Sequence, residues 1–213
     1  MRLILASTSP ARLAVLRSAG VEPVVRPSEV DEDAVLAAAG PLDPAATVLT
    51  LAKAKALAVA DGPEREALDG LVLGGDSMFE VDGEIYGKPG SPEAARERWA
   101  LQRGRTGTLW SGHWMVDRRL GAPGDEGAGA VKSAEVTFVD DLDDAEVEAY
   151  IASGEPLWVA GAFTIDSLGG PFIERIDGDP STVIGISLPV VRRLARRLGA
   201  DWPSFWNRPG AAS

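Results

Sequence analysis

Short uninterrupted runs of apolar residues occur at intervals along the chain, and between them apolar residues recur at every third or fourth position. The runs predict buried strands, and the wider spacing predicts helices. The expected strands lie at residues 3–6, 24–25, 71–73, 108–117, 131–139 and 172–176. A turn signal at Asp82 and Gly83 predicts a hairpin after the third of these strands.

Polar cap residues and prolines mark where the expected helices begin, and glycines mark where several of them end. The expected helices run over residues 10–19, from near residue 44 onward, over 92–102, from 141 or 143 to 153, and over 189–198. Residues 121–130 are rich in glycine and are expected to form a loop, and residues 200–213 form a C-terminal tail.

Composition narrows the possible classes of protein. The 213 residues are 45% hydrophobic and 25% charged, which is typical of a globular chain, and the formal net charge of -11 argues against a general nucleic-acid binder. The absence of cysteine excludes disulfides, zinc–thiolate sites and cysteine nucleophiles. The first apolar run is too short for a signal peptide and no segment approaches transmembrane length, so we expect a cytoplasmic protein with no membrane partner.

A carboxylate and a lysine stand out around the third strand. Two glycines end this apolar run before Asp76, and Lys88 lies between a glycine and a proline. A buried carboxylate at a strand end is costly unless a cation or hydrogen-bond donors meet it. Asp76 and Lys88 at neighbouring strand ends suit either a hydrolase that acts on a phosphate ester or a structural ion pair in a turn.

The first strand leads into a serine-rich turn and a helix start. Ser7 and Ser9 precede Pro10, and Arg12 lies in the first helical turn. Free backbone N–H groups and the helix dipole favour an anion at such a position. Arg12 favours phosphate binding here over a helix that is merely well capped.

Two lysines and an acidic run are further candidates. Lys53 and Lys55 are about 200° apart around the expected helix, so only one of them can face a given site. Residues 29–33 carry four acids, which are typical of a solvated surface but could instead supply a carboxylate for magnesium.

Missing residues exclude several reaction classes. The single histidine, His113, lacks a nucleophile-elbow sequence, and on a strand that also carries Trp110 and Trp114 it is expected to be a packed rather than a catalytic residue. The glycines of a Rossmann fingerprint and the lysine of a Walker loop are also missing. The remaining cations and carboxylates suit cleavage of a polyphosphate, in which cations neutralise the oxygens and a carboxylate orients water.

Seven motifs in order resemble the Maf family of nucleoside triphosphate pyrophosphatases, over nearly the whole chain. They are Ser7-Thr8-Ser9-Pro10-Ala11-Arg12, Ala52-Lys53-Ala54-Lys55-Ala56, Gly75-Asp76-Ser77, Gly87-Lys88-Pro89, Tyr150-Ile151-Ala152-Ser153-Gly154-Glu155-Pro156, Ala160-Gly161-Ala162-Phe163 and Val183-Ile184-Gly185-Ile186-Ser187-Leu188-Pro189. The combination is highly specific, although no single motif is.

The resemblance implies an α/β fold with a mixed sheet, akin to the inosine triphosphatase group, in which a single domain over residues 1–213 forms two lobes around a cleft. It implies hydrolysis of a nucleoside triphosphate to the monophosphate and pyrophosphate with a divalent metal, Mg²⁺ or Mn²⁺, and it makes a homodimer the expected assembly. The site residues that it implies are Asp76 as proton acceptor and metal ligand, Glu32 as a second carboxylate near the metal, Arg12, Lys55 and Lys88 as phosphate-binding cations, and Ser7 and Ser9 in the N-terminal loop.

Departures from the family pattern bear on the substrate. Ala11 stands where a second arginine is common, Ser77 where threonine follows the catalytic aspartate, and Gly107 where histidine is common. Asp166 lies in a stretch dense in small residues where the family often has glutamine, and an ionised aspartate only accepts hydrogen bonds. Ala11, Ser77 and Asp166 are therefore specificity candidates, and the preferred base stays open between pyrimidine, modified guanine and others.

A second function class is a non-catalytic, nucleotide-sensing regulator of septum formation. Such a regulator would keep the phosphate-binding cations without needing Asp76 as a base. Because the chain retains Asp76 together with these cations, the enzyme is the favoured interpretation.

Overall fold

The computed structural model describes residues 1–63, 65–122 and 127–207, and the chain divides into two compact units. The first unit comprises Met1–Asp76, Ser111–Lys132 and Gly185–Ser213. The second comprises Ser77–Trp110 and Ser133–Ile184. Each unit is therefore assembled from segments that are far apart in the sequence.

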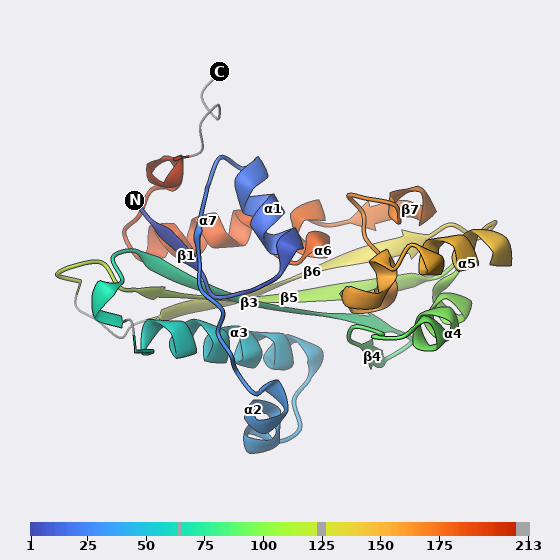
Figure 1. Ribbon diagram of the computed structural model, residues 1–213, viewed down its shortest axis with the longest axis horizontal. Coiled ribbons are helices and arrows are strands. Elements are labelled where there is room, and N and C mark those ends of the chain that lie inside the picture. Colours follow the sequence, from blue (N-terminus) through green and yellow to red (C-terminus); the bar gives the residue numbers. More distant parts are fainter. Residues whose placement is uncertain (64, 123–126, 208–213) are drawn as a thin grey trace. The chain divides into compact units, whose positions relative to one another are not determined.

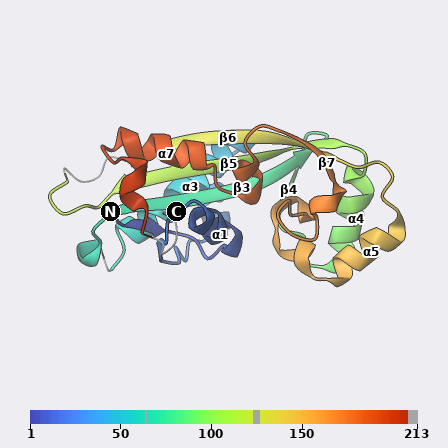
Figure 2. The same ribbon diagram turned by 90° about the horizontal axis from the view of Figure 1, so that it is seen from above.

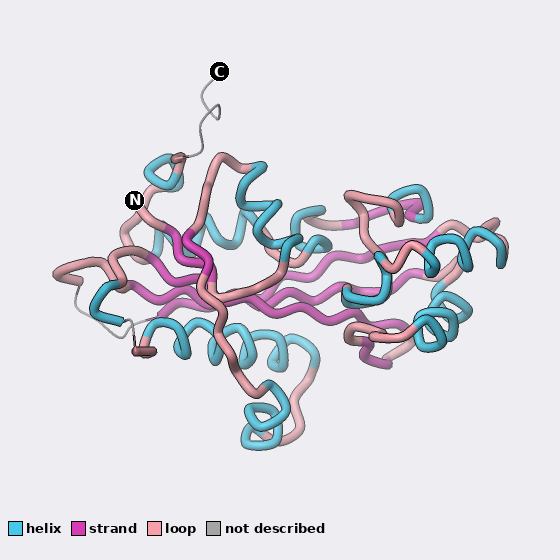
Figure 3. The backbone as a smooth tube through the Cα atoms, in the orientation of Figure 1, coloured by secondary structure: helices cyan, strands magenta, loops and turns pink. Residues whose placement is uncertain are grey.

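The strands, magenta in Figure 3, form a mixed sheet. Their order is β2-β1-β3-β5-β6-β7, with β4 paired to β3. β1 pairs in parallel with β2 and β3, whereas β4 and β7 run antiparallel to β3 and β6. The strands are β1 (Leu3–Leu5), β2 (Val24–Val25), β3 (Leu71–Val81), β4 (Glu84–Tyr86), β5 (Thr106–Asp117), β6 (Gly127–Phe138) and β7 (Ile173–Asp177). The mixed α/β class that the resemblance implies is confirmed.

The helices start where the caps predict. Ser9, Ser91, Asp143 and Ser187 each accept a hydrogen bond from a backbone N–H of the helix that follows. The helices are α1 (Pro10–Ser18), α2 (Glu32–Ala39), α3 (Pro44–Ala60), α4 (Pro92–Gln102), α5 (Asp144–Ala152), α6 (Pro180–Ile184) and α7 (Leu188–Arg197). The sequence pattern did not predict α2 and α6, because both are too short to show a clear apolar period.

In the first unit, helices cover both faces of the sheet (Figure 1). Ile4 and Val72 face α3, where they pack with Ala56 and Ala60. Successive strand residues point to opposite faces, so the neighbouring apolar residues of β1 and β3 face α1 and α7. This two-sided burial explains why β1 and the first part of β3 are continuous apolar runs.

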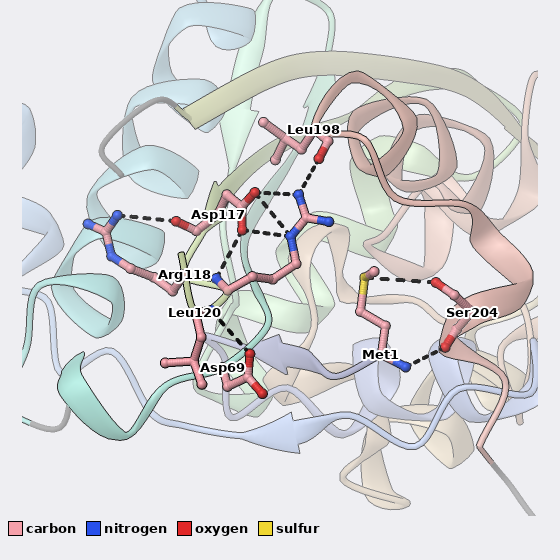
Figure 4. A network of polar contacts seen from close by, with 8 residues as sticks. Met1, Asp69, Asp117, Arg118, Leu120, Leu198 and Ser204 are labelled. Carbon is pink, nitrogen blue, oxygen red and sulfur yellow. Dashed lines mark hydrogen bonds and ion pairs between the residues drawn. The ribbon is translucent and has the colours of Figure 1, made fainter. Parts of the chain in front are cut away.

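An ionic network joins the end of β5 to the ends of α3 and α7 in the first unit, and Figure 4 shows its contacts at Asp117 and Leu198. Arg119 donates to the carboxylate of Asp117 and, at 2.5 Å, to the carbonyl of Leu198, which follows α7. Arg118 donates to the side chain of Asp61 at 2.5 Å and to the last carbonyl of α3. Nearby, the amino group of Met1 donates to the carbonyl of Ser204 at 2.6 Å.

The second unit has an aromatic core. Phe138 lies edge-to-face against three rings, those of Phe79, Trp99 and Phe163, with centroids 5.0–5.9 Å apart. The fully buried Trp99 also donates its indole N–H to the carbonyl of Ala162 at 3.0 Å. Trp99 belongs to α4, which packs beside α5 (Figure 2).

Two strands differ from the sequence prediction. β3 does not end at the glycine pair but continues through Asp76 to Val81, so Asp76 is a mid-strand residue rather than a strand-end residue. β6 begins at Gly127, within the expected glycine-rich loop, of which residues 123–126 lie outside the described residues. A Cβ on Gly127 or Gly129 would lie 2.2–2.3 Å from the indole of Trp114. These glycines therefore make room for a ring and do not interrupt the strand.

The C-terminal tail contains a short 3₁₀ turn, Trp202–Phe205, and the buried side chain of Phe205 docks it on the first unit. Asn207 bonds through its backbone and side chain to Gly20 and Glu22. Residues 208–213 of the expected tail lie outside the described residues. Across the described residues, the helices are all too short or too polar to span a bilayer.

Candidate active site

The carboxylate of Asp76 lies in the middle of β3 and meets an ammonium group from α3. The Nζ atom of Lys55 is 2.6 Å from Oδ1 of Asp76, and the two side chains are only 11% and 10% exposed. Charge-assisted hydrogen bonds of this length are the strong kind. A buried ion pair therefore occupies the position that the sequence marks for the proton acceptor.

Glycine lets α3 lie directly on the strand at this point. A Cβ on Gly74 would fall 2.2 Å from the carbonyl oxygen of Ala52 and 2.7 Å from the backbone nitrogen of Ala56. Lys55 is therefore carried on the turn of α3 that touches β3. Lys53 points elsewhere, as the helical spacing predicts: its side chain is exposed and its Nζ lies 4.8 Å from the ring centroid of Trp114.

A second carboxylate approaches the same ammonium group from α2. Oε1 of Glu32 lies 2.7 Å from Nζ of Lys55, and the Glu32 side chain is 49% exposed. Glu32 occupies the first turn of α2, which Asp31 caps through a hydrogen bond to the backbone N–H of Ala34. The acidic run thus supplies both a helix cap and a site carboxylate.

The N-terminus of α1 brings hydroxyl groups and a guanidinium to the same region. The Ser7 hydroxyl accepts hydrogen bonds from the backbone N–H of Ser9 and from Nη1 of Arg12, each at 3.2 Å. Nε of Arg12 donates to the carbonyl of Gly185 at 2.8 Å. A Cβ on Gly75 would lie 3.4 Å from this Nε, so the guanidinium lies along β3 beside the residue that precedes Asp76.

Burial and charge act against each other in this cluster. Burial raises the pKa of the Asp76 carboxyl above its usual value, while Lys55 and Arg12 oppose that rise and Glu32 adds to it. Burial likewise lowers the pKa of the Arg12 guanidinium, against the attraction of Asp76 and Glu32. Arg12 still remains a cation, because a guanidinium is not deprotonated in proteins. A carboxylate with a raised pKa is a better proton acceptor near neutral pH.

Glu32 and Asp76 fit a magnesium-type site completed by substrate oxygens. Both carboxylates reach one ammonium group, so a single small cation placed between them could contact both. Mg²⁺ commonly takes one or two carboxylates and leaves its other positions to phosphate oxygens and water. Among the described residues no group of three or more histidine, cysteine or acidic side chains could hold a metal. A site made of protein ligands alone is therefore not indicated in this part of the chain.

The other site residues that the sequence predicts make none of the contacts described above. Ala11 is half-buried in α1 of the first unit. Ser77, Lys88 and Asp166 belong to the second unit. Lys88 is exposed in a loop whose ends are held by hydrogen bonds from Arg98 to the Gly87 carbonyl at 2.5 Å and from the Gly90 N–H to the Leu157 carbonyl at 3.0 Å.

Sequence reasoning missed some of the supporting residues. The Gly185 carbonyl that holds Arg12 lies 173 positions away in the chain, and although Gly185 belongs to the motif at residues 183–189, the sequence does not show that this motif meets Arg12. His113 is fully buried, as expected for a packed residue, and its Nε2 accepts a hydrogen bond from the backbone N–H of Ser187 at 2.8 Å.

Comparison with known proteins points to one family. The family model described as "Maf: Maf-like protein" matches residues 2–198. The chain is 60% identical, over all of both chains, to a protein of Leifsonia xyli subsp. xyli named nucleoside triphosphate pyrophosphatase. It is 51% identical to a protein of the same name from Nocardia farcinica, over 97% of each chain.

Similarity to solved structures is weaker. A nucleoside-triphosphatase/dITP/XTP pyrophosphatase from Mycobacterium abscessus aligns with a TM-score of 0.39 and 14% identity, over 92% of this chain and 94% of that one. The Ham1 protein of Staphylococcus aureus aligns with a TM-score of 0.36 and 14% identity, over 66% of this chain and 73% of that one. The family match and the close relatives, which cover nearly the whole chain, show that it belongs to the Maf family.

Proposed function

We propose that this chain is a nucleoside triphosphate pyrophosphatase, which hydrolyses a ribo- or deoxyribonucleoside triphosphate to the monophosphate and pyrophosphate. The observation that carries the proposal is the buried Asp76 on β3, in contact with Lys55 and in the electrostatic field of Arg12. Relatives at up to 60% identity bear the name of this activity. The physiological role is clearance of unwanted nucleotides or control of the nucleotide pool.

In the proposed reaction, Asp76 takes a proton from a water molecule while the water oxygen attacks the α-phosphorus. The bond between the α-phosphorus and the bridging oxygen breaks, and pyrophosphate leaves with the electron pair. Arg12, Lys55 and the hydroxyls of Ser7 and Ser9 bind the phosphate oxygens, with Lys88 of the second unit as a further proposed cation. Fixed cations at the oxygens stabilise the negative charge of the transition state.

Glu32 and Asp76 are the proposed ligands of a divalent metal, Mg²⁺ or Mn²⁺. When bound, such an ion supplies neutralisation of the phosphate charge. Lys55 already contacts both carboxylates, so it holds them in place for the ion and for the triphosphate. The same proposal includes a cytoplasmic homodimer, with Ala11, Ser77 and Asp166 influencing which base is accepted.

The test is release of pyrophosphate from a panel of standard and modified nucleoside triphosphates, with Mg²⁺ and with Mn²⁺, by the wild type and by Asp76→Asn. We expect the wild type to give monophosphate and pyrophosphate in equal amounts. Asp76→Asn keeps the shape of the side chain but cannot take the proton, so kcat should fall by about 10²–10⁴-fold. Asp61→Asn, which alters an exposed carboxylate paired with Arg118, is the matched control and should retain kcat.

Each alternative gives a different result. Release of diphosphate and inorganic phosphate would place the cleaved bond between the β- and γ-phosphates and refute the proposed reaction. Unchanged turnover by Asp76→Asn would remove Asp76 as the proton acceptor. Nucleotide binding without turnover by the wild type would favour the nucleotide-sensing regulator of septum formation.

A further inference from the structure

His113 connects β5 to the segment that leads into α7. The imidazole is fully buried, and its Nε2 atom accepts a hydrogen bond from the backbone N–H of Ser187 at 2.8 Å. The two residues are 74 positions apart in the chain, and both Ser187 and the preceding Ile186 are almost completely buried. An imidazole nitrogen that accepts a hydrogen bond carries no proton, so a neutral ring has its proton on Nδ1. His113 thus acts as a buried acceptor for one backbone group.

That backbone group belongs to residues 185–187, here called the 185–187 link, which joins α6 to α7. At one end of the link, the Gly185 carbonyl accepts the hydrogen bond from Nε of Arg12 at 2.8 Å. At the other end, Ser187 caps α7, since its hydroxyl accepts from the N–H of Val190. The φ of Gly185 is 114°, in the region that favours glycine, so another residue would strain the backbone that directs this carbonyl.

The groups that connect His113 to Arg12 lie on one face of the sheet, within the first unit. A Cβ on Gly112 would lie 2.2 Å from the carbonyl oxygen of Val48, so Gly112 faces α3. His113 follows Gly112 in β5 and therefore points to the opposite face, which α1 and α7 cover. Arg12 lies on that face too, since its Nε is 3.4 Å from the Cβ position of Gly75 in the neighbouring β3.

The bond to Gly185 contributes to the orientation of the Arg12 guanidinium. A guanidinium is planar, so bonds from two of its nitrogens fix both its position and its plane. Nε donates to Gly185, and Nη1 donates to the Ser7 hydroxyl at 3.2 Å. Ser7 is local to Arg12, whereas Gly185 comes from the other end of the sequence, so its carbonyl needs a support of its own. The bond from Ser187 to His113, two residues further on, is such a support.

We propose that His113 is a positioning residue for the triphosphate site. By accepting the Ser187 N–H, it fixes the 185–187 link, so that the Gly185 carbonyl orients the Arg12 guanidinium toward the phosphates. This inference rests on the proposed function, because it takes Arg12 as a phosphate-binding cation. It adds that the strength of phosphate binding by Arg12 depends on an acceptor atom buried on β5.

A ring nitrogen on a strand is suited to this task. The Ser187 N–H precedes the first turn of α7, so it has no acceptor within that helix. A buried N–H without an acceptor is costly, so the link would shift until another acceptor reached this group. The imidazole has only two rotatable bonds and stands on a central strand of the sheet, so it offers the acceptor in one place.

The experiment compares His113→Asn and His113→Gln with the wild type. Dissociation constants are measured by calorimetry for α,β-methylene analogues of the common nucleoside triphosphates, in which the bond to be cleaved is replaced, and kcat/KM is measured for the triphosphates themselves. The Gln amide reaches the position of Nε2 and keeps an acceptor for Ser187, whereas the Asn amide ends near the position of Nδ1.

We expect His113→Asn to raise the Kd about tenfold and to lower kcat/KM by about the same factor, because Arg12 loses its fixed orientation. His113→Gln should restore most of the affinity. His113→Leu, which also removes the acceptor, serves if His113→Asn folds poorly. A His113→Asn protein that binds with wild-type affinity, or a His113→Gln protein as impaired as His113→Asn, would overturn the inference.

A second set of variants tests whether His113 acts through Arg12. In Arg12→Ala the guanidinium is gone, so adding His113→Asn should leave the Kd within about twofold of the value for Arg12→Ala alone. A purely structural role for His113 would weaken binding by the same factor whether or not Arg12 is present. That result would contradict a positioning role.

Val116→Ala is the matched control for a loss of stability. Val116 is a fully buried residue of β5 and belongs to the apolar cluster that also contains Ala60 of α3. It lies three positions after His113, so its side chain points to the other face of the sheet. Its truncation should lower the free energy of unfolding in urea but leave the Kd within about twofold of the wild type. Equal weakening of binding by Val116→Ala and His113→Asn would indicate general loosening of the fold and refute the specific role of His113.

Binding and turnover separate this inference from the proposed function. A wild type that binds the analogues but hydrolyses no triphosphate would refute the pyrophosphatase, while the dissociation constants of the variants would still test His113. A wild type that binds none of the analogues would overturn the inference, since Arg12 would then hold no triphosphate.

Discussion

The ammonium group of Lys55 lies between two carboxylates of very different exposure. Asp76 is almost completely buried, whereas about half of the Glu32 side chain is open to solvent. Burial of the Asp76 carboxylate disfavours its charged form more strongly than the attraction of Lys55 and Arg12 favours it, because the pKa of Asp76 remains raised. The cluster therefore holds a charge whose burial is costly, and Lys55 limits that cost.

Removing the Lys55 ammonium group should destabilise the fold, because the buried carboxylate of Asp76 then lacks this cation. In Lys55→Met the alkyl chain keeps its packing but Asp76 and Glu32 lose their shared cation. We expect the free energy of unfolding at pH 7 to fall by about 3–5 kcal/mol, as when one partner of a buried pair is removed. Urea unfolding followed by circular dichroism gives this value.

Lys53→Met provides the control for that substitution. Lys53 lies on the same helix but is exposed, and its contact with the Trp114 ring contributes about 0.5–1 kcal/mol. Equal losses in the two variants would contradict the buried-pair account. Adding Asp76→Asn to Lys55→Met should restore part of the loss, because the buried charge itself is then gone.

At the scale of elements, glycines determine how closely α3 packs on the sheet. Gly74 of β3 and Gly112 of β5 each face the helix so closely that a Cβ would lie 2.2 Å from the carbonyl oxygens of Ala52 and Val48. In the sequence, Gly74 and Gly75 stand together at the end of an apolar run, a position that predicts the end of a strand. Only the packing of a distant helix shows that Gly74 is needed inside the strand.

Gly74→Ala should therefore move the site as well as destabilise the fold. The added methyl group forces α3 away from β3, and overpacking of this kind costs about 1–3 kcal/mol. Because Lys55 lies on the displaced turn, kcat/KM for hydrolysis should fall together with stability. Urea unfolding and steady-state kinetics on the same preparation test both effects.

Gly87→Ala is the matched glycine substitution for stability. Among the described residues other than the chain neighbours of Gly87, no heavy atom lies within 4 Å of its Cβ position, and its φ is outside the left-handed region. Its free energy of unfolding should stay within about 0.5 kcal/mol of the wild type. A Gly74→Ala protein as stable and active as the wild type would show that α3 is free to shift without disturbing Lys55.

At the scale of the molecule, the sequence predicts what is local and misses what is long-range. Caps such as Ser9 and Asp143 act within one helical turn, so α1 and α5 begin where the pattern predicts. The bond from Arg12 to Gly185 and the bond from Ser187 to His113 join segments that share no pattern. Residue types and positions alone mark Asp76, Lys88 and Arg12, and the resemblance selects Lys55 and Glu32, whereas the contacts of Lys55 with Asp76 and Glu32 come only from the fold.

The last helix of the first unit, α7, is expected to influence the position of Arg12, which lies near the start of the chain. α7 buries Val190, Val191, Leu194 and Ala195, while its arginines are exposed, as its apolar period predicts. The segment leading into it carries the Gly185 carbonyl that holds Arg12. We therefore expect the packing of α7 and the position of the Arg12 guanidinium to be coupled.

Leu194→Ala tests that coupling. The substitution removes a buried side chain and leaves a cavity, so the free energy of unfolding should fall by about 2–5 kcal/mol, whereas the exposed neighbour Arg193→Ala should change it by less than about 0.5 kcal/mol. Because α7 then opens more often, backbone amides of α7 should exchange hydrogen faster, and affinity for the triphosphate should weaken through Arg12. If stability falls but triphosphate affinity stays at the wild-type value, the bond from Arg12 to Gly185 contributes nothing to the site, and the coupling is refuted.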